Sequence, residues 1–166
     1  MTSSVPKPSV KYPFVPKSTA YLEPGHFWSI PLDNGGFACG RVLQLEMIEG
    51  KRDRRMFLAG LLAWHGDSLP TEDSIAGAQL IDHGDVHIKA ITENAGEVQG
   101  FRCLELDRID VPLTLDESPG PGCCLRRGFD RLGAATEEQQ QRLPVFSTWG
   151  YGVIKDLAEM HFGKSL

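Results

Sequence analysis

Alternating side chains near the N-terminus predict a pair of strands. Phe27, Ser29 and Pro31 alternate with the apolar residues Trp28, Ile30 and Leu32. Residues 33–36 read Asp-Asn-Gly-Gly, a turn sequence in which positive φ costs little. Residues 37–43 return as a second strand, so we expect a hairpin that places Ile30 and Leu32 in a core and opens a small barrel or curved sheet.

The later pattern predicts more strands and two helices. We expect a buried strand over 56–64, a capped helical turn over 71–76, strands over 79–82, 86–92 and 98–106, a short helix from 136 and a C-terminal helix over about 153–162. The fold class is therefore α+β and mainly β. It is either a strongly curved antiparallel sheet or a small, partly open barrel with the C-terminal helix packed on it.

The distribution of proline and glycine sets the predicted domain limits. Residues 1–22 hold four prolines and are expected to form an extended, partly disordered arm. Residues 23–166 are expected to be a single β-rich domain. Within it, residues 116–133 are predicted to be a long loop of Pro, Gly and Arg, either functional or mobile.

Composition indicates an ordinary globular chain of 166 residues. No apolar run is long enough to span a bilayer, and residues 1–17 lack the apolar centre of a secretory signal. The four cysteines match no zinc or redox spacing, so we expect reduced thiols. Together these features favour a cytoplasmic protein that does not contact a membrane.

Charge is concentrated in the middle of the chain. Residues 67–119 hold 12 acidic and 3 basic residues and so carry −9, whereas the rest carries +4 of the total of −5. An acidic middle makes binding to a nucleic-acid backbone unlikely, and it would attract a basic protein partner. The alternative is an acidic face that is simply solvated.

Two constellations resemble catalytic chemistry without a full signature. His83 and His87, which flank Asp85, would share a face and could bind one metal ion if they lay on a helix, but on a strand they would be about 13 Å apart. A pairing of His65 or His161 with Asp67 or Cys39 has no nucleophile motif around it. The three tryptophans, Trp28, Trp64 and Trp149, fit a core better than a ligand cage. We therefore expect no catalytic residue, no metal and no cofactor.

The hairpin also carries a family resemblance. Its pattern consists of Gly25, Phe27, Ile30, Pro31, Leu32, Gly35, Gly36, Phe37, Gly40, Arg41, Val42 and Leu43. This pattern resembles the immunity protein 26 family, whose members are bacterial proteins encoded beside polymorphic toxins that they neutralise by binding. The resemblance implies a protein toxin as partner and supplies no catalytic residues. It is best over residues 23–45. Gly40 would let the strand bend or another backbone approach, and Arg41 would brace acidic residues or reach a partner.

Three functional hypotheses follow. The first is an immunity protein whose acidic surface covers a basic site, such as a nuclease cleft, on its cognate toxin. Its expected contacts are Asp82, Asp85, Glu93, Glu97, Asp107 and Asp110. The second is a small-barrel recognition module for a peptide or nucleic acid, using Lys51, Arg52, Arg54 and Arg55 or Arg126, Arg127 and Arg131. The third and least favoured is a metal-dependent hydrolase. Each of the three hypotheses is compatible with a homo-oligomer.

Overall fold

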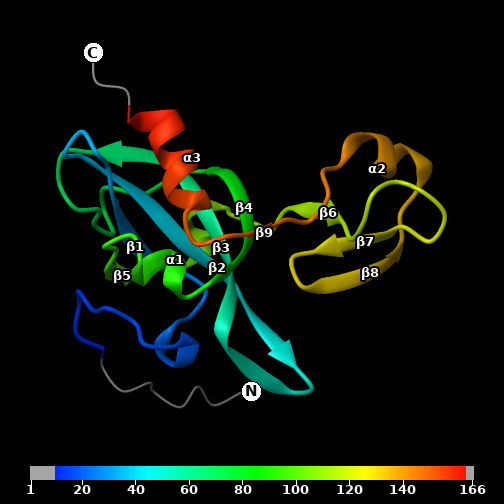
Figure 1. Ribbon diagram of the computed structural model, residues 1–166, viewed down its shortest axis with the longest axis horizontal. Coiled ribbons are helices and arrows are strands. Elements are labelled where there is room, and N and C mark those ends of the chain that lie inside the picture. Colours follow the sequence, from blue (N-terminus) through cyan, green and yellow to red (C-terminus); the bar gives the residue numbers. More distant parts are fainter. Residues whose placement is uncertain (1–9, 164–166) are drawn as a thin grey trace.

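The computed structural model describes residues 10–163 and contains two sheets (Figure 1). The larger sheet has the strand order β5-β1-β2-β3-β4-β9, and the smaller has the order β6-β7-β8. In the described range the strands are β1 His26–Pro31, β2 Phe37–Ile48, β3 Lys51–Gly66, β4 Leu80–His87, β5 Val98–Phe101, β6 Leu113–Leu115, β7 Cys124–Arg127, β8 Asp130–Ala134 and β9 Thr148–Trp149. The helices are η1 Thr19–Tyr21, α1 Lys89–Thr92, η2 Leu104–Asp107, α2 Glu137–Arg142 and α3 Val153–Phe162.

The larger sheet confirms the predicted curved antiparallel fold. β1 to β5 pair antiparallel, and only the short β9 joins in parallel. Register shifts interrupt the β2–β3 ladder at three places and the β3–β4 ladder at one, and such bulges increase the local bend and twist. β5 and β9 remain as separate edges, so the sheet is curved but open.

The predicted opening hairpin is present. β1 and β2 pair from Phe27 opposite Arg41 to Pro31 opposite Phe37, and Gly35 in the turn has φ of +87°. The C-terminal helix α3, which spans the predicted residues 153–162, holds this turn from the other side. The Glu159 carboxylate accepts a bond from the Asp33 amide at 2.7 Å, and the Lys155 ammonium donates to the Pro31 carbonyl.

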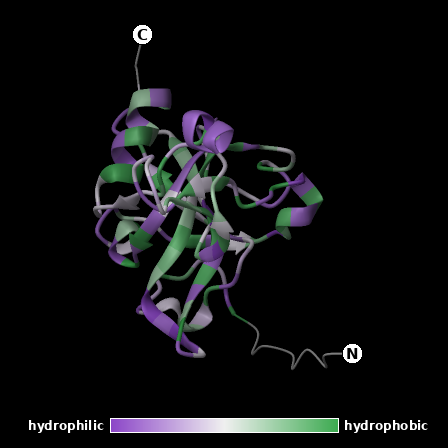
Figure 2. Cartoon of the chain, turned by 90° about the vertical axis from the view of Figure 1, so that its right-hand side faces the viewer, coloured by the Kyte–Doolittle hydropathy of each residue, from purple (hydrophilic) through white to green (hydrophobic). Residues whose placement is uncertain are grey.

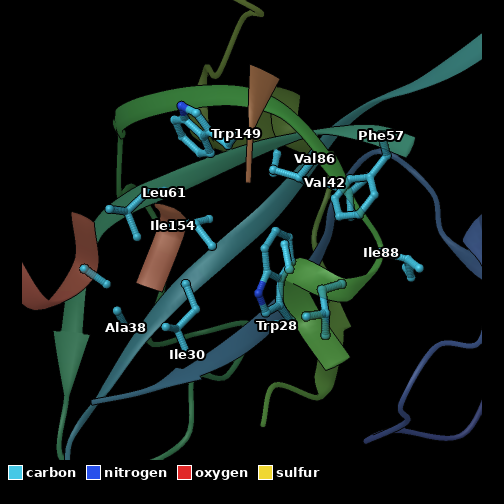
Figure 3. Close-up of a cluster of buried hydrophobic side chains, with 14 of the residues drawn as sticks. Trp28, Ile30, Ala38, Val42, Phe57, Leu61, Val86, Ile88, Trp149 and Ile154 are labelled. Carbon is cyan, nitrogen blue, oxygen red and sulfur yellow. The ribbon is translucent and has the colours of Figure 1, made fainter. Parts of the chain in front are cut away.

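Side chains on the two faces of the sheet form two separate cores. Ile30 and Leu32 point into the first core, as predicted, together with Trp28 and with Ile154 of α3 (Figure 3). Phe27 points to the opposite face and joins the second core with Leu58 and Ile75. Hydrophobic residues of the central strands therefore lie on both faces of the sheet. The sequence of α2 is hydrophilic throughout, as its colour in Figure 2 shows.

Gly40 lies at a register shift of the β2–β3 ladder, as expected for a bend in the strand, and it also meets a side chain closely. A Cβ atom at Gly40 would lie 2.2 Å from the Trp28 ring, so the glycine makes room for an indole on the neighbouring strand. A close approach of another backbone occurs at Gly25, where φ is +111° and a Cβ would lie 2.8 Å from the Arg102 carbonyl oxygen.

The predicted loop over 116–133 is wrong in its second half. Residues 124–134 form the β7–β8 hairpin, which turns at Gly128 with φ of +60°, and α2 follows with a complete capping box from Thr136 to Gln139. The two short strands were not predicted because the segment is rich in glycine and proline and because most of their side chains are exposed, so no apolar pattern marks them. The small sheet attaches to the large one through Gln44, whose amide oxygen accepts from the Phe129 amide at 2.9 Å.

Three predicted strand limits are also wrong. Residues 79–82 and 86–92 are not two strands: β4 runs unbroken from Leu80 to His87, and residues 89–92 form α1. The strand expected over 98–106 ends at Phe101, and η2 follows. The capped turn over 71–76 is present as a turn rather than a helix, with Thr71 accepting from the Ser74 amide at 3.1 Å.

The described part of the N-terminal arm packs on the body. Phe14 forms a bridge with Val98 of the edge strand β5, and Leu22 is fully buried. Arg52 donates to the carbonyl oxygens of Thr19, Ala20 and Leu22. The first nine residues of the predicted arm lie outside the described range.

Candidate functional site

A buried carboxylate organises one face of the large sheet. Asp107, on η2, is 4% exposed, and it binds Arg41 of β2 at 2.8 Å and Arg102 at 2.9 Å. Its other oxygen also accepts from the Gly77 amide at 2.8 Å. Burial alone would raise the pKa of Asp107, but the hydrogen bonds from Arg102, Gly77 and Arg41 together hold it well below its usual range.

The same residue joins two loops to the sheet. The Gln79 amide donates to the Asp107 carbonyl oxygen at 2.7 Å, and Arg41 also donates to the Arg102 and Cys103 carbonyls. Residues 71–79 and 102–112 are therefore fixed relative to each other and to β2. Of the two roles expected for Arg41, the structure shows the bracing of an acidic residue.

These loops carry exposed carboxylates outside and apolar side chains inside. Ile75, Leu104 and Ile109 pack into the second core beneath the loops. The side chains on the outer side are exposed, and we call their surface the acidic loop face: Glu72, Asp73, Glu105 and Asp110. The proximity of Glu72 and Asp73 contributes to the raised pKa of Arg102, after the larger effect of the hydrogen bond to Asp107.

A shallow hollow borders the acidic loop face. It has a volume of about 330 Å³, and its lining residues are Gln79, Leu80, Arg108, Ile109, Asp110, Val111 and Pro112. The hollow therefore combines aliphatic walls with one carboxylate and one guanidinium. This lining suits an aliphatic side chain that ends in a charge.

The six acidic residues expected to contact a toxin do not lie together. Asp107 is buried and fully engaged, so it acts as an internal brace and is unavailable to a partner. Asp110 belongs to the acidic loop face. Asp82 is exposed on β4. Glu93 and Glu97 precede β5, which is the edge strand at the opposite end of the large sheet from β4 and β9.

Asp85 lies apart from these residues, in a second acidic group. It is half-buried on β4, and its pKa is raised to about 7 by burial and then by repulsion from Glu46 and Asp53, which Arg126 partly offsets. The Arg126 guanidinium lies 3.9 Å from the centre of the Phe146 ring. This group therefore lies between the large sheet and the β7 strand of the small one.

The basic residues of the recognition hypothesis have several environments. Arg52 is bound to the arm carbonyls and to Glu23 at 3.0 Å, so it is structural. Arg131 pairs with Asp116 at 3.0 Å. The side chains left exposed are Lys51, Arg54, Arg55 and Arg127.

The candidate catalytic residues lie in three places: His83 and His87 on β4, Cys39 on β2, and His65 with Asp67 at one hollow beside the β1–β2 turn. His83 and His87 lie four positions apart on β4, and within residues 10–163 no group of three or more His, Cys, Asp or Glu side chains is placed to hold a metal. Cys39 is fully buried, and burial raises the pKa of its thiol, which opposes formation of a nucleophilic thiolate.

The histidines and tryptophans also have structural surroundings. His65 stacks on the Phe162 ring of α3 at 4.9 Å. Trp28 and Trp149 belong to the first core, and Trp64 packs against the second. These tryptophans therefore form no common cage. In the same described range, no helix is long and apolar enough to cross a membrane.

The acidic loop face was only partly predictable. The sequence singles out Asp110 as a toxin contact, whereas it marks Glu72, Asp73 and Glu105 as acidic residues without a binding role. The contact that joins their loops links Arg41 to Asp107, 66 positions later in the sequence. A contact between residues so far apart cannot be predicted from a local sequence pattern.

Comparison with known proteins supports the family resemblance of the opening hairpin. The model of the family described as immunity protein 26 matches residues 23–103. No match was found among curated proteins or among solved structures. The matched segment runs from the opening hairpin to the start of the Arg102–Asp107 loop. The resemblance that the hairpin predicted is therefore confirmed, and over residues 23–103 this chain matches the immunity protein 26 family.

Proposed function

We propose that this protein neutralises a cognate toxin by direct binding, without catalysis, through its acidic loop face. The family name supports a role as an immunity protein. The observation that carries the choice of surface is the Asp107 brace, which fixes two loops that expose Glu72, Asp73, Glu105 and Asp110. A preorganised surface loses less conformational entropy on binding than mobile loops would.

The chemistry of this face suits a basic partner. Four carboxylates and one exposed arginine give an excess of negative charge, which speeds association with a positive surface and opposes contact with other acidic proteins. The neighbouring hollow, with Leu80, Ile109 and Asp110 in its wall, would take the stem and charged end of a lysine or arginine. A toxin with a basic active cleft, such as a nuclease, has these features.

The test uses the toxin encoded beside this gene, if co-purification identifies one. Charge reversal of the whole face, with Glu72→Lys, Asp73→Lys, Glu105→Lys and Asp110→Lys, should weaken binding at least about 100-fold, since each disrupted charge contact is worth on the order of 1 kcal/mol. Isothermal titration calorimetry at low salt measures the change in Kd.

Two further variants separate this face from other acidic surfaces. Glu137→Lys with Glu138→Lys makes a similar change on α2, which buries no side chain, and should leave Kd within about threefold. Reversal of Glu93 and Glu97 tests the β5 edge, which also held expected contacts. Unchanged affinity in the four-residue variant, or an equal loss in either comparison, would contradict the proposal.

A further inference from the structure

A hollow on another side of the molecule has three cationic side chains in its lining. Its volume is about 430 Å³, and its lining residues are Pro16, Lys17, Arg55, His87, Ile88, Lys89 and Thr92. They come from the arm, β3, the end of β4 and α1, and these elements are fixed together there. The Ile88 amide, for example, donates to the Arg55 carbonyl at 2.7 Å.

The three cationic side chains of the hollow outnumber the carboxylates beside them. Within residues 10–163, Lys17, Arg55 and Lys89 form no ion pair. The nearby Asp53 carboxylate accepts from the backbone amides of Arg55 at 2.8 Å and Met56 at 2.9 Å, both on one oxygen, and its single negative charge leaves an excess of positive charge around the hollow. Three like charges around one concave surface repel one another unless an anion joins them.

His87 adds a directed donor to this group. Its Nδ1 accepts from the Lys89 amide at 3.1 Å, so the ring proton of the neutral form lies on Nε2. The ring also lies 5.4 Å from that of Tyr151, over which the Lys89 ammonium is held at 5.3 Å. These contacts hold the positions of His87 and Lys89 at the hollow.

We propose that this hollow binds a phosphate-bearing small molecule, with Lys17, Arg55 and Lys89 around the phosphate group. A phosphate dianion offers several acceptor oxygens to the fork of an arginine and the point charges of two lysines, which a single carboxylate would not satisfy. The hollow has the size of an ordinary small-ligand site. This site is separate from the acidic loop face and independent of toxin binding.

Calorimetric titration with inorganic phosphate tests the site directly. We expect saturable binding with Kd of about 1 mM or tighter at low ionic strength. Adenosine 5′-monophosphate and adenosine then distinguish the sources of the phosphate. Tighter binding of the nucleotide with none of adenosine indicates a phosphorylated metabolite, and equal binding of nucleotide and phosphate indicates free phosphate. No heat up to about 50 mM phosphate would overturn the proposal.

Variants locate the binding and have a matched control. Arg55→Gln and Lys89→Gln should each weaken phosphate binding about tenfold, as the loss of one charged hydrogen-bonding partner predicts. Arg54→Gln removes the same charge from the next position of β3, whose side chain points to the opposite face of the strand. An equal effect of Arg54→Gln would show nonspecific attraction and overturn the site. If a single-stranded oligonucleotide bound more than about 100-fold tighter than phosphate, the hollow would be a nucleic-acid site, and the proposal of a small phosphate-bearing ligand would be wrong.

The pH dependence gives an independent readout. Burial, followed by Lys89 and Arg55, lowers the pKa of His87, and Asp53 opposes this shift. The other groups around the ring are Lys17 and Tyr151. Sulfate, which stays a dianion, should bind more tightly as pH falls and His87 gains a proton, and His87→Gln should remove this dependence. A dependence that persists in His87→Gln would contradict the role of His87. Reversal of the acidic loop face should leave phosphate affinity unchanged, so failure of the two proposals can be told apart.

Discussion

Arg41 and Asp107 are fully buried charges, and each depends on the other. The Arg41 side chain is 0% exposed and lies 2.8 Å from the Asp107 carboxylate. Removing one member of a buried pair leaves the other without compensation, which costs more than the pair itself contributes. The pair therefore acts as a fixed point for the two loops of the acidic face.

Asp107→Asn should lower the free energy of unfolding by roughly 3 kcal/mol, because the Arg41 charge stays buried. Urea unfolding at pH 7 measures the difference. Asp110→Asn makes the same change at an exposed position and should shift it by less than about 0.5 kcal/mol. Because the pKa of Asp107 is lowered, its contribution is present above the unfolded pKa of about 4 and is lost as pH falls through the folded value. Equal stabilities for the two variants would contradict this role.

Asp85 should affect stability with the opposite sign. Its folded pKa of about 7 lies above the unfolded value of about 4, so the folded state binds the proton more tightly and stability falls as pH rises between these values. Asp85→Asn should be about 1–2 kcal/mol more stable than the parent at pH 8, less than the full shift implies because the group keeps some solvent contact. The gain should vanish below about pH 4. Thermal unfolding across this range checks it, and a gain that does not change with pH would point to packing instead.

At the scale of elements, the contact of β1 with β2 depends on a glycine opposite an indole. Trp28 and Gly40 are direct partners in the ladder, and the Trp28 ring covers the glycine. The ring then reaches the first core, where it meets Phe57 edge-on at 5.8 Å. The family pattern thus contains a packing requirement in addition to a turn.

Gly40→Ala should therefore lower stability by about 1–3 kcal/mol, since the added methyl group forces the Trp28 ring or the strand to move. Gly120→Ala is the control, because a Cβ there meets nothing within 4 Å and its φ is not positive. Chemical unfolding compares the two variants, and near-UV circular dichroism reports the environment of the indole. A stable Gly40→Ala protein with an unchanged indole signal would refute the packing argument.

The elements that could be predicted are those with local signals. The opening hairpin has both alternation and a turn sequence, and α3 has helical spacing over ten residues. The alternation of Val86, Ile88 and Ala90 predicts a strand over residues 86–92, whereas β4 ends at His87 and the amides of Ile91 and Thr92 donate to the Ile88 carbonyl in a helical turn. The face that Asp107 organises depends on contacts between distant segments, so only its overall acidity was visible in the sequence.

At the scale of the whole molecule, charge is separated between surfaces. The acidic loop face lies on η2 and the loop before β4, whereas the cationic hollow lies between the arm, β3 and α1. Such a separation orients an approaching partner as well as attracting it.

Salt should therefore slow toxin association more than it speeds dissociation. We expect the association rate to fall about tenfold between 20 mM and 500 mM salt, because screening shortens the range of the field, while the dissociation rate changes by less than about threefold. Surface plasmon resonance measures both rates. An association rate that does not depend on salt would argue against steering by the acidic loop face.

The tie between Arg52 and the arm has a consequence for where the folding unit begins and ends. A protein shortened to the family segment, residues 23–103, would lose the three carbonyl acceptors of Arg52 and the strand partner of Val98, and so would expose a sheet edge that can pair with other molecules. It would also lack Trp149 and Ile154, leaving one core open to water. Aggregation of such a fragment would mean that the segment matched by the family is shorter than the unit that folds, and it would say nothing against the binding surface.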